Sequence, residues 1–389
     1  MFENFKYTEK NAKIILIITS IFYILMTTVF YLDHYDYTLY MDMWSDFLQG
    51  KINPTYPIGF TFLFAPFYSI HPKLPKLVFC IAFLITAFQF YHLIYKGKEY
   101  KGLSDKKKFW ALMYIILSPA FASQVMSGLF DSIIGLFFFN IYLVSKSKKI
   151  HWILKDLICL GLILSSILIK FVGIFLIIPF LFFGRKRKVD GIENDGEGIK
   201  NFKLRLIFRF CLLGLILVGG LGFLYLLKVN PFSLLTPFMN QFVRDYKTFF
   251  DKVWGFSIDE PFFISVLVDI FSIISTYLFF FGLIIVYIYA YKKNLSTAAW
   301  MLLPILTFLT LFQVSHVQFL LWIIFIFTAY RLTDFQEKNL TKKMFLMQCI
   351  GFFVYMPFLQ LLYLYFIIDI FKMESREKDS IQVKTPIAC

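Results

Sequence analysis

Aspartate residues cluster in one short stretch of the chain, residues 33–57. Four carboxylates stand there among aromatic side chains: Asp33, Asp36, Asp42 and Asp46 beside Tyr35, Tyr37, Tyr40 and Trp44. A carboxylate can act as a general base that takes the proton of an attacking hydroxyl group. If residues 41–50 are helical, Asp42 and Asp46 share one face and Asp36 lies in a loop before the helix. Like charges on one face destabilise a helix slightly, so the cluster indicates a functional site rather than an ordinary solvated loop.

Two further charged residues stand in apolar surroundings. Lys170 interrupts the apolar run of residues 157–183, where an ammonium group costs about 2.5–3.5 kcal/mol on membrane-insertion scales. Such a lysine marks a functional site by default, although it can also snorkel at a hairpin tip or pair with Asp131 for structural reasons. Asp131 follows a loop and is equally placed to cap the helix after it.

The remaining polar residues of interest come later in the chain. His316 and Gln318 lie in an apolar region and either contact a ligand or are satisfied within the structure. Arg244 and Lys247 stand one helical turn apart, which is typical of a solvated face and also suits phosphate binding. Most tyrosines and tryptophans are expected in the aromatic belts of a membrane protein, and we assign a chemical role only to Tyr37.

The composition is that of a polytopic membrane protein. Hydrophobic residues make up 59% of the 389 residues and charged residues 16%, with a mean hydropathy of +0.70, which no single soluble core absorbs. The five cysteines show no CxxC spacing, so neither a structural metal site nor a disulfide framework is expected. The net charge of +14 follows from basic loops that orient a membrane protein, and no nucleic-acid partner is expected.

The basic residues orient the chain in the membrane. Lys6, Lys10 and Lys13 precede the first apolar run, residues 14–32, which is long enough to span and has no small-residue cleavage site. The N-terminus is therefore expected in the cytoplasm and the first loop, residues 33–76, outside. Residues 58–70 are too short to cross and predict an interfacial or re-entrant segment. Residues 77–95 then return to a lysine-rich inner loop.

Three apolar hairpins follow, each with short arms and basic ends. Their tips are residues 118–132, Lys170 and residues 312–318. Arms of this length do not span a bilayer perpendicular to it, so the tips are expected to line a recess open to the outside. Of the remaining segments, we predict a flexible inner loop at residues 184–209, an amphipathic outer loop at 229–261, and a last apolar run at 344–371. The polar tail, residues 372–389, lies outside if that run crosses once.

These assignments predict one all-α integral membrane domain over residues 1–389, with about 11 crossings. They place Asp36, Asp131, Lys170, Arg244, His316 and Gln318 on the outer side. A carboxylate facing a recess that holds a buried cation is what group transfer from a lipid-linked phosphate requires. The acid takes a proton from the acceptor hydroxyl, and the cation stabilises the departing phosphate.

Several motifs resemble one enzyme family in order along the chain. Asp36-Tyr37-Thr38-Leu39-Tyr40-Met41-Asp42, then Gly50-Lys51 and Tyr56-Pro57, resemble the first luminal loop of the glycosyltransferase C superfamily. The closest likeness is to mannosyltransferases that use polyprenyl-phosphate mannose, including the phosphatidylinositol-mannoside and GPI mannosyltransferase I groups. Three later segments also resemble the family: Ser118-Pro119 followed by Gly128 to Ser132, Gly161 to Lys170, and His316 to Trp322.

The resemblance implies a helical bundle with juxtamembrane helices in the first outer loop. It also implies transfer of a hexose, most simply mannose, from a polyprenyl-phosphate sugar to a glycan or glycolipid hydroxyl, with inversion at the anomeric carbon. Asp36 is then the general base. The acceptor or sugar is oriented by Asp42, Asp46 and Tyr37, and the donor phosphate is bound by Lys170, His316, Gln318 and Arg244.

The sequence departs from the family pattern at two positions. His34 stands where the GPI enzymes have the first Asp of a D-x-D motif, which argues against a bridged metal and predicts a reaction without metal or other cofactor. The usual proline shortly after the hairpin lysine is missing, which weakens the role carried over to Lys170.

Two other functions fit parts of the sequence. A polymerase or ligase acting on undecaprenyl-diphosphate glycans would favour several arginines in the outer loops, where this chain offers Arg244 apart from the tail. A lipid or sugar transporter would favour repeats with broken helices, and the three hairpins match this in part. Richness in Lys, Ile and Phe hints at a prokaryotic cell membrane.

Overall fold

The computed structural model describes residues 6–29, 33, 35–51, 56–184, 199–226, 262–311, 317–332 and 357–382. Every regular element in these ranges is an α-helix or a 3₁₀-helix, which confirms the predicted all-helical class. Four of the described helices are long and apolar enough to cross a membrane: Glu9–Val29, Leu74–Lys96, Trp152–Ile169 and Ile274–Lys293. These helices are compatible with a membrane protein, while the number of crossings stays a prediction.

The chain divides into two compact units. Unit 1 contains residues 1–140 and 316–359, and unit 2 contains residues 141–315 and 360–389. Unit 1 is built on α1 (Glu9–Val29), α4 (Leu74–Lys96), α5 (Asp105–Ile116) and α6 (Pro119–Met126), with α15 (Ile324–Leu332) against α4 and α5. It also holds the 3₁₀-helices η1 (Lys98–Tyr100) and η4 (Val317–Trp322) and the first part of α7 (Asp131–Lys146).

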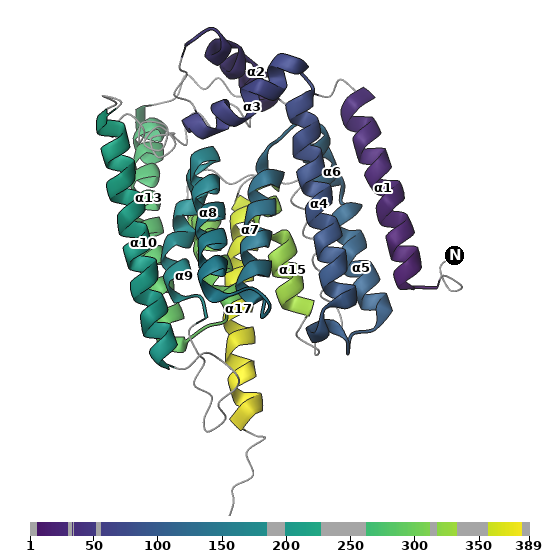
Figure 1. Cartoon of the computed structure of the whole chain (residues 1–389), viewed down its shortest axis with the longest axis vertical. Helices are drawn as coiled ribbons and strands as arrows, with labels where there is room; N and C mark the ends of the chain where they lie inside the picture. Colours follow the sequence, from purple (N-terminus) through teal and green to yellow (C-terminus); the bar gives the residue numbers. More distant parts are fainter. Residues whose placement is uncertain are drawn as a thin grey trace, which may run out of the picture. The chain divides into compact units, whose positions relative to one another are not determined.

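Two short helices, α2 (Tyr35–Leu48) and α3 (Ile58–Ile70), lie across the end of unit 1 where α4 begins (Figure 1). The buried face of α2 carries Tyr37, Tyr40, Met43 and Trp44. Tyr40 and Trp44 pack on Phe60 of α3, with ring centroids 5.1 and 5.5 Å apart. The opposite face of α3 exposes Phe62 and other apolar residues. A helix of 13 residues is too short to span a bilayer, and an apolar face on each side suits a juxtamembrane position.

The structure corrects two predicted boundaries in unit 1. Helix α2 begins at Tyr35 and not at Met41, so Asp36 lies in its first turn and not in a preceding loop. The helix extends backwards because Tyr37, Tyr40 and Trp44 recur at helical spacing and bury together; a carboxylate also suits the positive end of the helix dipole. The hairpin tip at residues 118–132 contains a helix of its own, α6, with Pro119 at its first position.

Unit 2 contains the hairpin that the sequence predicts around Lys170. Helix α8 (Trp152–Ile169) ends directly before this lysine, and η2 (Phe171–Leu176) with α9 (Ile177–Phe182) follows it. The other helices of unit 2 are α10 (Ile199–Leu226), α13 (Phe262–Lys293), α14 (Thr297–Leu311) and α17 (Pro357–Gln382), whose first residues are counted with unit 1. Helices α10 and α13 each expose a row of large apolar side chains, which a lipid environment would cover.

Three predictions for unit 2 need correction or fall outside the described residues. The predicted flexible loop at residues 184–209 is too long, because α10 already begins at Ile199. The predicted polar tail begins inside α17, which continues to Gln382. The described part of this helix begins at Pro357, and residues 344–356 of the predicted last apolar run lie outside the described residues. The predicted outer loop at residues 229–261 lies outside the described residues.

Glu374, in the second half of α17, lies beside the start of α14. The Glu374 carboxylate accepts hydrogen bonds from the Ser296 hydroxyl at 2.6 Å and from the Ser296 backbone N–H at 3.3 Å. Nearby, the ring of Phe371 lies 4.6 Å from that of Tyr289. The Phe371–Glu374 turn of α17 therefore lies beside the Lys292–Lys293 end of α13, for which the sequence predicts a cytoplasmic position.

This contact predicts that the C-terminus and the Lys292–Lys293 turn face the same side of the membrane, contrary to a tail left outside by a single crossing. One variant should keep Cys389 as its sole cysteine, and a second should have Asn294→Cys as its sole cysteine. A membrane-impermeant maleimide applied to sealed vesicles of known orientation is expected to label both or neither. Labelling of one and not the other would contradict the prediction.

Candidate functional site

The carboxylates of Asp36 and Asp131 both contribute to the electrostatic surroundings of Tyr40. Tyr40 lies one helical turn after Asp36 on α2, is fully buried, and is hydrogen-bonded to Tyr56. Burial raises the pKa of Tyr40 well above its usual value, and the neighbouring Tyr56 hydroxyl and the charges of Asp36 and Asp131 raise it further. Two carboxylates that are nearly a hundred residues apart in sequence therefore influence the pKa of the same buried tyrosine.

Asp131 also contacts the segment that ends in Trp322. Its Oδ1 accepts a hydrogen bond of 2.6 Å from the indole N–H of Trp322, and both side chains are buried. The next residue, Ser132, donates to the carbonyl oxygen of Phe79 on α4 at 2.7 Å. The start of α7 is thus tied to both η4 and α4. Asp131 belongs to unit 1 and Lys170 to unit 2, so the pairing considered from the sequence stays a prediction.

Tyr37 joins α2 to the start of α4. Its hydroxyl donates to the carbonyl oxygen of Pro72 at 2.6 Å and is also hydrogen-bonded to the backbone of Lys76. Burial raises the pKa of Tyr37 and the Lys76 contact opposes this. The sugar-orienting role expected for Tyr37 stays a prediction, while its hydroxyl contacts show a structural one.

A glycine is required beneath the Tyr37 ring. Gly128 has a φ of +93°, and a Cβ there would lie 2.5 Å from Tyr37 Cδ2. We expect Gly128→Ala to lower the unfolding free energy by about 2–4 kcal/mol, the sum of backbone strain and a displaced aromatic ring. Gly50→Ala is the matched control, since Gly50 has a φ of +79° with no atom within 4 Å of the added carbon. Thermal unfolding in detergent should show a larger loss of stability for Gly128→Ala than for Gly50→Ala. Equal losses of stability would contradict the close packing of Tyr37 on Gly128.

Asp42 and Asp46, the last two aspartates of the cluster, lie away from the buried face of α2. Asp42 is exposed and Asp46 partly exposed, and they lie one turn apart as predicted. Six residues of helix separate Asp42 from Asp36 and turn it to another side of α2. The structure therefore sets Asp36 beside Tyr40 and keeps Asp42 and Asp46 apart from both.

The predicted phosphate ligands are distributed between the two units. Lys170 is 9% exposed, has extended backbone geometry, and lies in unit 2 at the turn between α8 and η2. Gln318 is 8% exposed and lies in η4 of unit 1. His316 and Arg244, together with Lys247, fall outside the described residues. The convergence of these groups on Asp36 stays a prediction.

A buried lysine that the sequence pattern did not single out, Lys76, lies beside Asp33, the first aspartate of the cluster. Lys76 Nζ lies 2.8 Å from Asp33 Oδ1, and the lysine side chain is fully buried. Its ammonium group also lies 5.8 Å from the centroid of the Tyr37 ring. A signal existed in the sequence, because Lys76 falls in the segment predicted to lie outside, where the positive-inside rule expects few basic residues.

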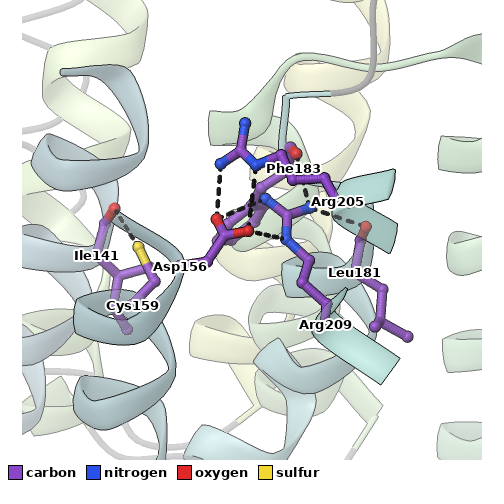
Figure 2. Close-up of polar contacts among 7 residues, drawn as sticks. All are labelled: Ile141, Asp156, Cys159, Leu181, Phe183, Arg205 and Arg209. Atoms are coloured by element: carbon purple, nitrogen blue, oxygen red, sulfur yellow. Dashed lines mark hydrogen bonds and ion pairs between the residues drawn. The ribbon is translucent and has the colours of Figure 1, made fainter. Parts of the chain in front are cut away.

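Unit 2 holds a buried charge cluster that the sequence pattern did not single out (Figure 2). Both oxygens of Asp156 on α8 accept hydrogen bonds from Arg205 and from Arg209 on α10, at 2.6–3.1 Å. Arg209 Nη1 also donates to the carbonyl oxygens of Leu181 and Phe183, at 2.9 and 2.8 Å. The cluster holds together the start of α8, the end of α9 and the start of α10. Asp156 is bound by two guanidinium groups, so the arrangement suits a structural clamp.

No family model, curated protein or solved structure matches this chain. The resemblance to the glycosyltransferase C superfamily therefore rests on the motifs alone. Within the described ranges, no group of three or more His, Cys, Asp or Glu side chains is arranged to hold a metal ion.

Proposed function

We propose that this protein is an integral membrane glycosyltransferase. It moves a hexose, by motif resemblance mannose, from a polyprenyl-phosphate sugar to a hydroxyl group of a glycan or glycolipid acceptor. One observation supports this proposal above the others. Asp36, Asp131 and Trp322 come from three separate family-like segments of unit 1. Asp131 is hydrogen-bonded to Trp322, and the charges of Asp36 and Asp131 both help to raise the pKa of the buried Tyr40.

The proposed reaction is a single displacement at the anomeric carbon. The acceptor oxygen attacks that carbon while Asp36 takes its proton, and the bond from the carbon to the phosphate oxygen breaks. The phosphate leaves on its polyprenyl chain, the configuration inverts, and the proton ends on the Asp36 carboxyl group. Lys170, with His316, Gln318 and Arg244, stabilises the charge on the leaving phosphate. Asp42 and Asp46 orient acceptor or sugar hydroxyls.

The proposal includes an orientation. The N-terminus and the lysine-rich loops face the cytoplasm, and the acidic first loop faces the outer side of a prokaryotic cell membrane. The donor's polyprenyl chain lies along apolar helix faces while its phosphate sugar reaches the outer surface. Polyprenyl-phosphate sugar and glycan or glycolipid are thus the expected partners.

Asp36→Asn tests the proposal most directly. Membranes carrying the full chain are supplied with polyprenyl-phosphate mannose, and transfer to lipid and glycan acceptors is measured. Loss of a general base is expected to lower the rate at least about 100-fold. Asp105→Asn is the control, since Asp105 is exposed at the start of α5, and it should keep the wild-type rate. Full transfer by Asp36→Asn would remove the proposed base.

A second measurement tests the reaction class. Detergent-purified protein is heated with polyprenyl-phosphate mannose, with undecaprenyl diphosphate, or with free mannose. Stabilisation by the first ligand alone supports the proposed donor. Stabilisation by undecaprenyl diphosphate alone, or by free mannose, would favour a polymerase or a transporter and overturn the proposal.

A further inference from the structure

Lys76 contacts residues on both sides of Asp36. Its ammonium group pairs with Asp33 Oδ1 at 2.8 Å, three residues before Asp36. Its backbone is hydrogen-bonded to the hydroxyl of Tyr37, the residue directly after Asp36, and its ammonium group lies 5.8 Å from the centre of that ring. One residue of α4 therefore holds both ends of the short segment on which Asp36 lies.

Burial of Lys76 restricts where Asp33 can lie. The Lys76 side chain is 0% exposed and that of Asp33 is 22% exposed. A buried ammonium group is tolerated only where a charged or polar partner compensates for its lost hydration. Asp33 is therefore held against α4, whereas a fully solvated ion pair would leave it free to move.

The start of α4 also fixes the second carboxylate of the site. Ser132, next to Asp131, donates to the carbonyl oxygen of Phe79, less than one turn after Lys76. The Tyr37 ring lies over Gly128, three residues before Asp131. The first two turns of α4 thus place the start of α2 with Asp36 and the start of α7 with Asp131.

We propose that Lys76 and Asp33 form a positioning pair for the general base Asp36. The inference rests on the glycosyltransferase function proposed above. Lys76 acts through Asp33 and the first turn of α2 and does not itself contact the sugar or phosphate. Because a small misplacement of a catalytic group lowers the rate strongly, breaking the pair lowers kcat while the donor still binds.

The test compares single and double variants of the pair in the mannose-transfer assay. Lys76→Met and Asp33→Leu are each expected to lower kcat about 10- to 100-fold with KM for polyprenyl-phosphate mannose changed less than about 3-fold. Lys76→Arg and Asp33→Glu, which keep the charges, should recover part of the lost rate. Lys73→Met is the control, since Lys73 stands at the same helix end and its ammonium group donates to Thr28 of α1.

The double variant Asp33→Leu/Lys76→Met separates positioning from stability. It leaves no unpaired charge buried, so its thermal stability should return toward the wild-type value. Its kcat should stay low, because no ion pair holds the segment around Asp36 against α4. A double variant that recovers kcat together with stability would overturn the inference, as would single variants that lose stability at full kcat.

Asp36→Asn is assayed alongside these variants. If Asp36→Asn is inactive and the pair variants keep full kcat, the positioning role is wrong and the proposed function stands. If Asp36→Asn keeps full activity, the proposed base itself fails, whatever the pair variants do.

Discussion

Asp156→Ala is expected to lower the unfolding free energy by about 3–5 kcal/mol, the usual cost of removing one partner from a buried ion pair. Arg209 is fully buried and Arg205 nearly so, and both donate to the Asp156 carboxylate. Without it, two guanidinium groups stay in an apolar interior with no carboxylate between them. The packing of the start of α10 on the start of α8 should then loosen, because Asp156 makes the ion pairs between them (Figure 2).

The measurement is thermal or denaturant unfolding of the purified protein in detergent. Asp105→Ala is the matched control, since Asp105 is exposed and should change the free energy by less than about 0.5 kcal/mol. Replacing all three charged residues, as Asp156→Leu/Arg205→Met/Arg209→Met, should recover most of the loss, because apolar packing often equals a buried ion cluster in stability. A loss for Asp156→Ala no larger than for the control would show that the clamp does not stabilise the fold.

The sequence predicted the helical class and several element boundaries well. High apolar content and the spacing of basic residues are local signals, and they were enough to place the two arms around Lys170, where α8 ends at Ile169 and η2 begins at Phe171. The predicted start of α2 was six residues too late. The prediction followed the spacing of the aspartates and overlooked the buried aromatic face that begins at Tyr37.

The site was predictable only in part, because ion pairs join residues far apart in the chain. Asp36 and Asp131 stood out by type and surroundings, and both contribute to the raised pKa of Tyr40. Lys76 with Asp33, and Asp156 with its two arginines, have no local pattern that names their partners. A basic residue on the predicted outer side, or an acidic residue inside an apolar run, is nevertheless a signal that a partner must exist.

Gly135→Ala is expected to lower the unfolding free energy by about 3–5 kcal/mol, through overlap with backbone and the loss of a buried hydrogen bond. Gly135 lies one turn after Asp131 on the same face of α7. A Cβ at this position would overlap the carbonyl oxygen of Leu321 and lie 3.1 Å from its carbonyl carbon. The obstacle is backbone, which cannot rotate away as a side chain can, so η4 must move off α7.

Displacing Leu321 would also pull its neighbour, Trp322, away from Asp131. The hydrogen bond from the Trp322 indole to the Asp131 carboxylate would then be lost. We therefore expect Gly135→Ala to lose transfer activity as well as stability, and Asp131→Asn, which keeps the shape of the side chain, to be milder in stability. Gly161→Ala is the matched control: Gly161 also lies inside a helix, and an added Cβ meets no atom within 4 Å. It should be neutral or slightly stabilising. If Gly135→Ala were as stable as Gly161→Ala, the close packing of η4 on α7 would be wrong, and with it the meeting of the Asp131 and Trp322 segments that supports the proposed site.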